Sequence, residues 1–226
     1  VRRRKSDKSS KLANTMKIVA IVQARMGSTR LPNKVMKPLG GIPMIEMLLT
    51  RLARAKEVDQ IIVATSIDER NLPLVDHVRK LGYTCEQGSE NDVLERYLQT
   101  AEKHAADVVV RITGDCPLVD PDLVDEVIRR FKASNVDYFS NTNPPTYPDG
   151  LDIEIFTFKA LEQASQETSD PFDREHVTPY LRKLGKFQTA ALQYSQDLSA
   201  LRWTVDEDAD FAVIEKVFQH FHPRKN

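Results

Sequence analysis

The sequence predicts an α/β protein in which a mostly parallel sheet is flanked by helices. Apolar runs of strand length alternate with amphipathic stretches of helix length through the first 140 residues. The apolar runs are mostly continuous, which is typical of parallel strands buried on both faces. The links between them are short, so strand–helix–strand units with right-handed crossovers are expected.

Four strands and three helices follow from these patterns. The strands are expected at Ile18–Val22, Gln60–Thr65, Tyr83–Glu86 and Val108–Ile112. The helices are expected where apolar residues recur at helical spacing, at Met44–Ala55, Asp92–Ala105 and Pro121–Phe131. Pro121 suits the first position of its helix, where the missing N–H has no intrahelical partner to lose.

After Ser140 the alternation is lost. Residues 141–150 form a Pro-rich stretch that contains too many turn residues for a helix or a central strand. The elements expected next are a strand-like run over 151–158, a helix from Lys159, a polar loop over 170–176, a further helical stretch, β-leaning runs at Phe187–Tyr194 and Arg202–Val205, and a helix from Asp208. We interpret residues 140–195 as a small excursion from the sheet that builds an acceptor pocket or a subunit contact.

The composition is that of one soluble domain, which we expect over residues 16–222. Apolar residues make up 41% of the 226, the mean hydropathy is -0.42, and no run of about 18 uncharged apolar residues could span a bilayer. The net charge of -1 provides no general reason to expect a nucleic-acid partner. Two cysteines, Cys85 and Cys116, are too few for a disulfide framework and indicate free thiols in a reducing cytoplasm.

The charge is concentrated at the start of the chain. Residues 1–15 carry six Lys/Arg against one Asp, and the remaining 211 residues carry 26 Lys/Arg against 32 Asp/Glu. This stretch lacks the apolar core of a signal peptide and the amphipathic period of a transit peptide. We interpret it as a disordered basic leader, with a targeting arm or an RNA-binding tail as alternatives. Since the chain starts with Val and ends without a capped finish, we expect it to come from a longer multidomain protein.

The segment QARMGSTRLPNK, residues 23–34, carries the strongest functional signal. It follows the first expected strand, and ligands of open α/β sheets bind beyond the carboxyl ends of the strands. Its glycine, two hydroxyl residues and three cations suit a triphosphate, because backbone N–H groups and fixed charges both stabilise phosphate oxygens. Neither a P-loop nor a dinucleotide-binding glycine motif is present.

A second signal is RITGDCPLVDP, which stands at the end of the expected Val108–Ile112 strand. Asp115 is thereby placed at the same edge of the sheet as the basic loop. Nucleotidyl transfer builds negative charge on the phosphoryl oxygens and on the leaving pyrophosphate, and a hard divalent cation held by carboxylates stabilises both. Asp115 is therefore the first candidate metal ligand, and a Gly-Asp turn before Pro is the structural alternative.

These motifs resemble the cytidylyltransferase family that includes the CMP-Kdo and CMP-sialate synthetases. QARMGSTRLPNKVMKPLGGIPM is similar to the opening of that family, most of all to its spore-coat polysaccharide biosynthesis protein F branch. The similarity continues through DVLERY, RITGDCPLVDP, GLDIEIF, DREHVTPY and RWTVDEDADF, and so extends from Lys17 to about Phe218. Six ordered motifs at suitable spacing are far more specific than any single one.

The resemblance implies a GT-A-like (Rossmann-type) fold, CTP as the donor, Mg²⁺ as the cofactor, a small acceptor and a homodimer. The acceptor that it implies is an acidic or phosphorylated sugar-type molecule used in polysaccharide or glycan biosynthesis. It also makes Asp206 the second metal ligand beside Asp115, although Asp206 or Asp208 would equally cap the final helix.

Residues of the loop and of the neighbouring strand ends are assigned to the nucleotide. The catalytic candidates are Arg25, Lys34 and Asp115. The nucleotide-binding candidates are Gln23, Ala24, Arg25, Gly27, Ser28, Thr29, Arg30, Lys34, Gly88, Ser89 and Arg111.

Four residues after position 150 are candidates for acceptor binding: Asp152, Glu154, Arg174 and His176. Asp152 and Glu154 are two apart, so they share one face of a strand, where they could also form a solvated edge. Arg174 suits an acidic acceptor, and His176 is either a general base or a structural histidine.

The sequence thus predicts a cytidylyltransferase. Two alternatives remain at this point. The DED sequence at 206–208 mimics the D-x-D metal motif of GT-A glycosyltransferases. A non-catalytic nucleotide-binding module of a larger protein is the other.

Overall fold

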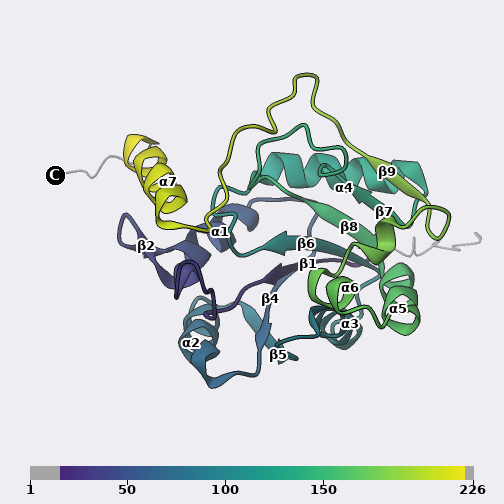
Figure 1. The fold of residues 1–226 in the computed structure, drawn as a ribbon, viewed down its shortest axis with the longest axis horizontal. Coiled ribbons are helices and arrows are strands. Elements are labelled where there is room, and N and C mark those ends of the chain that lie inside the picture. Colours follow the sequence, from purple (N-terminus) through teal and green to yellow (C-terminus); the bar gives the residue numbers. More distant parts are fainter. Residues whose placement is uncertain (1–15, 222–226) are drawn as a thin grey trace, which may run out of the picture.

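A mixed seven-stranded sheet forms the centre of the computed structural model, which describes residues 16–221 (Figure 1). The basic leader expected at 1–15 and the expected domain end at 222 lie outside the described residues. The strands follow one another across the sheet in the order β5 (Thr84–Gly88), β4 (Gln60–Ser66), β1 (Ile18–Gln23), β6 (Val108–Thr113), β8 (Glu154–Thr157), β7 (Tyr138–Ser140) and β9 (Thr189–Ala191).

The sheet is mostly parallel, as predicted. β5, β4, β1 and β6 pair in parallel, and so do β7 and β9. β8 lies between β6 and β7 and runs antiparallel to both. The carboxyl ends of β1 and β6 therefore meet at one edge, with Gln23 paired to Thr113.

Helices cover both faces. One face carries α1 (Met44–Leu52), α2 (Leu72–Lys80) and α4 (Pro121–Ser134), and the other carries α3 (Val93–Lys103), α5 (Phe158–Glu167) and α6 (Pro171–His176) (Figure 1).

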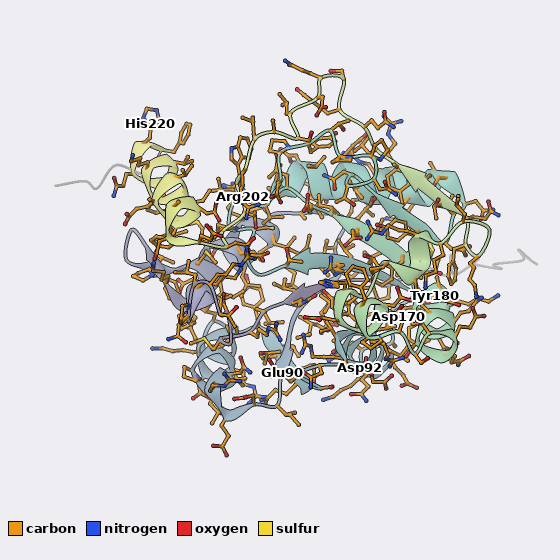
Figure 2. The ribbon with its side chains drawn as sticks, in the orientation of Figure 1. Glu90, Asp92, Asp170, Tyr180, Arg202 and His220 are labelled. Atoms are coloured by element: carbon orange, nitrogen blue, oxygen red, sulfur yellow. The ribbon has the colours of Figure 1, made fainter. Side chains whose placement is uncertain are left out.

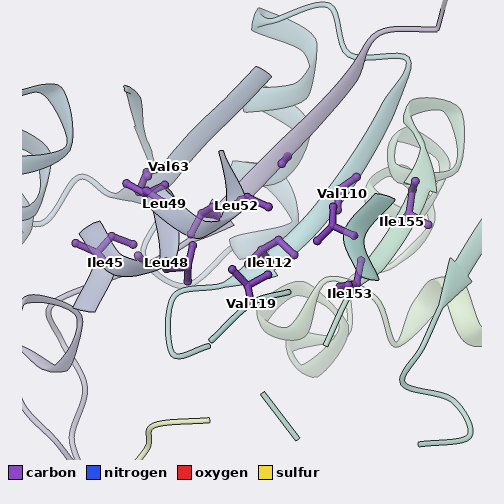
Figure 3. Close-up of a cluster of buried hydrophobic side chains, with 14 of the residues drawn as sticks. Ile45, Leu48, Leu49, Leu52, Val63, Val110, Ile112, Val119, Ile153 and Ile155 are labelled. Carbon is purple, nitrogen blue, oxygen red and sulfur yellow. The ribbon is translucent and has the colours of Figure 1, made fainter. Parts of the chain in front are cut away.

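Each face has its own core, and this is why β1 is apolar at five successive positions, 18–22. Along β1, Ile18, Ala20 and Val22 pack against the α1 face, as part of the cluster drawn in Figure 3. Val19 and Ile21 face α3 on the other side. Since successive side chains of a strand point to opposite faces, both faces must be apolar when both are covered.

A third cluster joins the segment after β1 to the last helix. The last helix, α7 (Asp208–Phe221), lies apart from the sheet beside a hairpin of β2 (Pro38–Leu39) and β3 (Ile42–Pro43) (Figure 1). Leu31 and Leu39 pack there with Val205 and Ile214. This contact brings the segment before α7 to the loop that follows β1.

The interpretation of residues 140–195 as an excursion needs correction. β8 and β9 are strands of the main sheet, because their backbones pair with β6 and β7. The polar stretch at 170–176 is the short helix α6, begun by Pro171 and by an Asp170 side chain that accepts from the Phe172 N–H. Arg202–Val205 contributes only an isolated bridge between Arg202 and Asp149.

Three elements without a sequence prediction are α2, β7 and the β2–β3 hairpin, and three short 3₁₀ helices are added at Lys34–Met36, Glu69–Asn71 and Tyr180–Arg182. Both cysteines are buried free thiols, as expected. Among residues 16–221, no helix combines the length and the apolar character needed to cross a membrane.

Candidate active site

The loop after β1 lies against the turn after β6. The backbone N–H of Met26 donates to the buried side chain of Asn71 at 2.8 Å, which fixes the loop from the opposite side. Gly114 allows the close approach of the two segments, because a Cβ there would stand 2.9 Å from the Gln23 carbonyl oxygen and 2.9 Å from the Ala24 Cβ. The glycine of the RITGD motif thus brings Asp115 to the loop.

A cavity of about 360 Å³ opens at this edge of the sheet. It is lined by most of the residues assigned to the nucleotide, namely Gln23, Ala24, Arg25, Gly27, Ser28, Thr29, Arg30, Lys34 and Arg111, together with Asp115 and Asp206. Val35, Val93, Arg96, Thr113, Gly114, Glu175 and His176 complete the lining. Gly88 and Ser89 are not among the lining residues.

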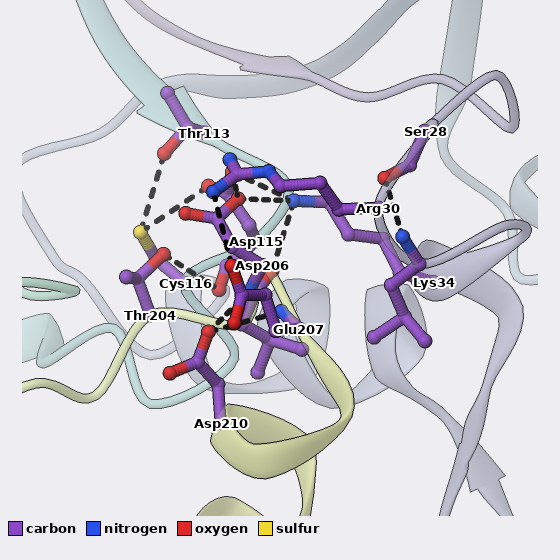
Figure 4. A network of polar contacts seen from close by, with 12 residues as sticks. Ser28, Arg30, Lys34, Thr113, Asp115, Cys116, Thr204, Asp206, Glu207 and Asp210 are labelled. Atoms are coloured by element: carbon purple, nitrogen blue, oxygen red, sulfur yellow. Dashed lines mark hydrogen bonds and ion pairs between the residues drawn. The ribbon is translucent and has the colours of Figure 1, made fainter.

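Lys34 lies between the two expected metal ligands. Its Nζ is 3.1 Å from Asp115 Oδ2, 3.0 Å from Asp206 Oδ1 and 2.8 Å from the Val205 carbonyl oxygen (Figure 4). Asp115 and Asp206 are 91 positions apart in the sequence, yet their carboxylates share one ammonium group. The structure therefore brings together the three residues on which the predicted chemistry depends.

Asp206 is held from three sides. Arg30 Nη2 is 3.0 Å from its Oδ1, and Arg202 Nη2 donates to its Oδ2 at 2.7 Å. The backbone N–H groups of Asp206 and Glu207 donate to Asp210 in the first turn of α7 (Figure 4). Burial raises the pKa of Asp206, but the Lys34 and Arg202 cations outweigh it and hold that pKa below its usual range.

Arg202 links this carboxylate to the Pro-rich loop. Its guanidinium, which lies between the start of α7 and the body of the protein (Figure 2), contacts Asp149 at 2.6 Å and Asp210 at 3.0 Å as well as Asp206. Residues far apart in the sequence thereby orient one ligand candidate, as outer partners commonly do at metal sites.

The donor chemistry suits Mg²⁺. Residues 16–221 contain no group of three or more His, Cys, Asp or Glu side chains arranged to hold a metal ion. Two hard carboxylates that already share a cation are nevertheless sufficient, because Mg²⁺ usually takes one or two carboxylates and completes its shell with phosphate oxygens and water.

The residues assigned to the acceptor are divided. His176 lines the cavity, beside Glu175, whereas Asp152, Glu154 and Arg174 are not lining residues. The Arg174 guanidinium is engaged with α3, since it contacts Asp92 at 2.6 Å and donates to the Ser165 carbonyl at 2.8 Å. Arg174 therefore fastens α6, which carries His176, to the neighbouring helix.

Glu154 is not on a solvated edge. It is 5% exposed, forms an ion pair with Arg111 and accepts a hydrogen bond of 2.6 Å from Tyr138 Oη. Burial alone raises the pKa of Glu154, but Arg111 and the hydrogen bonds from Tyr138 and Thr178 lower it overall. Glu154 thus positions Arg111, which is at the cavity wall.

Asp152 is a half-buried carboxylate behind the site. Burial, with repulsion from Asp149 and Glu154, raises its pKa to about 7. The folded protein therefore keeps a proton that the unfolded chain releases near pH 4, so folding stability falls as the pH rises from about 4 to 7.

We expect Asp152→Asn to remove this pH dependence. Without divalent cations, the unaltered protein should lose roughly 2–3 kcal/mol of unfolding free energy between pH 5 and pH 8 through this group. Urea titrations at both pH values measure the difference. An equal loss in the variant would contradict the assignment.

Gly150 determines how the Pro-rich loop packs against the segment that leads to Asp206. Asp149 exchanges backbone hydrogen bonds with Leu201, Trp203 and Thr204. Gly150 has φ +107°, and a Cβ there would stand 2.4 Å from the Thr204 nitrogen. Only glycine fits this conformation and this contact.

Gly150→Ala is accordingly expected to destabilise the fold by about 2–4 kcal/mol, from backbone strain and overpacking together. Gly185→Ala is the matched control, because Gly185 has φ +78° and no atom within 4 Å of its added Cβ. Urea unfolding of both variants separates strain from the clash. Equal losses would show that the contact with Thr204 is unimportant.

Arg96 is a cavity residue that the sequence analysis did not identify. Arg96 belongs to the DVLERY motif, but nothing in that motif shows that its side chain turns inward from α3. Gly88 and Ser89, which were assigned to the nucleotide, lie beside Arg96.

Comparison with known proteins agrees with this geometry. A protein family described as cytidylyltransferase matches residues 19–219. An uncharacterized protein of Methanocaldococcus jannaschii is 40% identical over 209 residues, 91% of this chain and 85% of that protein. The spore coat polysaccharide biosynthesis protein SpsF of Bacillus subtilis is 34% identical over 89% of this chain and 86% of its own length. The solved structure of a cytidylyltransferase from Leptospira borgpetersenii superposes with a TM-score of 0.88 at 33% identity, covering 91% of this chain and 88% of that one.

Proposed function

The chain belongs to the cytidylyltransferase family, whose members are nucleotidyltransferases, and on this premise we propose that it transfers CMP from CTP to an acidic or phosphorylated sugar-type acceptor. The observation that carries the proposal is the convergence of Lys34, Asp115 and Asp206 at the wall of one cavity beside the basic loop. The likeness to a protein named for spore-coat polysaccharide biosynthesis supports a role in polysaccharide or glycan synthesis.

In the proposed reaction an acceptor oxygen forms a bond to the α-phosphorus of CTP. The bond from that phosphorus to the bridging oxygen breaks, and its electron pair leaves with pyrophosphate. Arg30 and Lys34 offset the charge of the phosphates, while N–H groups of the loop donate to their oxygens. Most of the rate acceleration then comes from positioning and from charge stabilisation.

Asp115 and Asp206 would hold Mg²⁺, which supplies Lewis-acid stabilisation of the phosphoryl oxygens and of the leaving pyrophosphate when bound. Lys34 is close enough to both carboxylates to keep them oriented. His176 lines the cavity and is our candidate to accept the proton of the acceptor.

The glycosyltransferase alternative requires Asp206 and Asp208 to act together as a D-x-D pair. Asp206 lines the cavity, whereas Asp208 is 82% exposed and contacts Lys37 at 2.7 Å on the outside. The two carboxylates thus point to different places and do not form a D-x-D pair, which favours nucleotidyl transfer over glycosyl transfer.

We also propose a homodimer in the cytoplasm. The dimer rests on the family resemblance, and the location rests on two buried free thiols.

Pyrophosphate release tests the reaction. The protein is incubated with CTP, Mg²⁺ and a panel of sugar acids and sugar phosphates, and released pyrophosphate is measured with the CMP-linked product by mass spectrometry. Acceptor-dependent pyrophosphate supports the proposal. Release of a nucleoside diphosphate from a nucleotide sugar would instead establish the glycosyltransferase.

A further inference from the structure

Arg96 is a buried cation in the wall of the cavity. It extends from the first turn of α3 with 1% of its surface exposed, and Val93, Leu94 and Tyr97 of the same helix are buried as well. Arginine is almost never fully buried unless it is paired, because removing its charge from water costs several kcal/mol. Burial accordingly lowers the pKa of Arg96.

Gly88 and Ser89 hold the Arg96 side chain in place. Gly88 leaves room for the aliphatic stem, since a Cβ at Gly88 would stand 2.9 Å from Arg96 Cγ. The Ser89 carbonyl oxygen accepts a hydrogen bond of 2.7 Å from Arg96 Nη1. The glycine and the serine that follow β5 therefore fix the direction of the guanidinium, which makes its position a built feature of the fold.

These contacts do not neutralise the charge of Arg96. Five Lys and Arg residues line the cavity, and four have a carboxylate partner: Arg25 pairs with Glu90, Arg30 with Asp206, Lys34 with Asp115 and Arg111 with Glu154. Within the described range 16–221, Arg96 has no ion pair, and its Nε has no hydrogen-bond partner.

Glu90 is the carboxylate that raises the pKa of Arg96, but its ion pair is with Arg25. Glu90 lies in the link between β5 and α3 (Figure 2), and its Oε1 is 2.9 Å from Arg25. Asp92 in the same link is paired with Arg174 and caps α3 through the Glu95 N–H. A neutral carbonyl contact cannot offset a full charge, so residues 16–221 leave this guanidinium without a paired counter-ion.

We propose that Arg96 binds a substrate oxyanion, a carboxylate or phosphate group, within this cavity. The inference deepens the proposed function and rests on it. The planar guanidinium presents paired N–H donors that match such oxygens. The negative charge of the ligand would offset the free-energy cost of burying the arginine cation. The oxyanion is either a phosphate of the triphosphate or the acid group of the acceptor.

Three variants of the full chain test the assignment. Arg96→Gln removes the charge, and Arg96→Lys keeps the charge but loses the planar fork. Arg130→Gln is the matched control, because Arg130 is 62% exposed and pairs with Glu126 one helical turn away. Calorimetry measures two binding events: CTP with Mg²⁺ to the free protein, and inorganic phosphate to the protein saturated with CTP and Mg²⁺.

We expect one of the two dissociation constants to rise at least tenfold in Arg96→Gln. The same constant should also rise in Arg96→Lys. Neither constant should change in Arg130→Gln. A loss confined to CTP assigns the oxyanion to the triphosphate. A loss confined to phosphate assigns it to the acceptor. The melting temperature of ligand-free Arg96→Gln should equal or exceed that of the unaltered protein, since an unpaired buried charge is removed.

Unchanged constants in both titrations, or a lower melting temperature with unchanged binding, would overturn the inference and make Arg96 structural. If the unaltered protein binds no CTP, the proposed function fails separately. In that case inorganic phosphate is titrated into the ligand-free unaltered protein and into ligand-free Arg96→Gln. A dissociation constant at least tenfold higher in the variant would still support oxyanion binding by Arg96.

Discussion

Replacing Asp115 by Asn is expected to weaken Mg²⁺-dependent binding of CTP by about a hundredfold, which corresponds to the few kcal/mol that a lost charge contact to a metal contributes. Asn keeps the volume of Asp115 but removes the negative charge that the two-carboxylate site requires. In the variant, the affinity for CTP should be the same with Mg²⁺ and with EDTA. Calorimetric titration under both conditions measures this.

Asp208→Asn is the control for this change. Asp208 belongs to the acidic run 206–208 that contains the other expected ligand, Asp206, but its exposed side chain contacts Lys37. The control substitution should leave the affinity within about twofold of the unaltered value, as is usual for an exposed ion pair. If Asp208→Asn weakened binding as strongly as Asp115→Asn, the D-x-D interpretation would regain support.

Glu154→Gln is expected to produce the largest loss of stability, about 3–5 kcal/mol of unfolding free energy. The substitution leaves Arg111 charged and buried without its carboxylate partner, while Tyr138 loses an ionised acceptor. Glu126→Gln is the matched control, since Glu126 also pairs with arginines but on the surface of α4, and its loss should stay below about 1 kcal/mol.

Urea titrations of the two variants measure the contrast. The effect should also depend on pH. Because the pKa of Glu154 is lowered in the folded protein, its contribution is complete above the ordinary glutamate value of about 4.3 and is lost as the pH falls through the lowered value. Equal losses from Glu154→Gln and Glu126→Gln at pH 7 would contradict a stabilising buried pair.

The first half of the fold was predictable because its elements are local. β1, β4, β5 and β6 begin within one residue of the expected positions, and α1 and α4 begin where the apolar period begins. α2 was missed although it has a proline in its first turn and buried Leu74, Val75 and Val78 at helical spacing. The signal for that helix was thus present and unused.

The second half was less predictable because its pairing is not local. β7 has three residues, and β8 reaches its place by pairing with a strand about 45 positions earlier in the chain. No local pattern distinguishes such a strand from an excursion. α6 could be recognised only from the Asp170–Pro171 start, since its short length leaves no clear apolar stripe.

At the site, the loop residues assigned to the nucleotide and Asp115 could be placed because a motif and two strand ends position them, and the family resemblance added Asp206; all of them line the cavity. Metal binding by the two carboxylates stays a prediction. Arg96, Arg202 and the true partner of Glu154 could not be placed in this way, since each depends on contacts across the fold. Arg202 meets Asp149 from 53 positions away, and Glu154 meets Arg111 from 43. Burial of a charged side chain is a tertiary property, and the sequence of one helix does not show it.

Calorimetry with CTP, UTP, ATP and GTP, each with Mg²⁺, tests the central claim most directly. The account predicts that CTP binds tightly, that its binding requires Mg²⁺, and that the other three triphosphates bind at least tenfold more weakly. Failure to bind any triphosphate, or preferential binding of a nucleotide-diphosphate sugar, would contradict it.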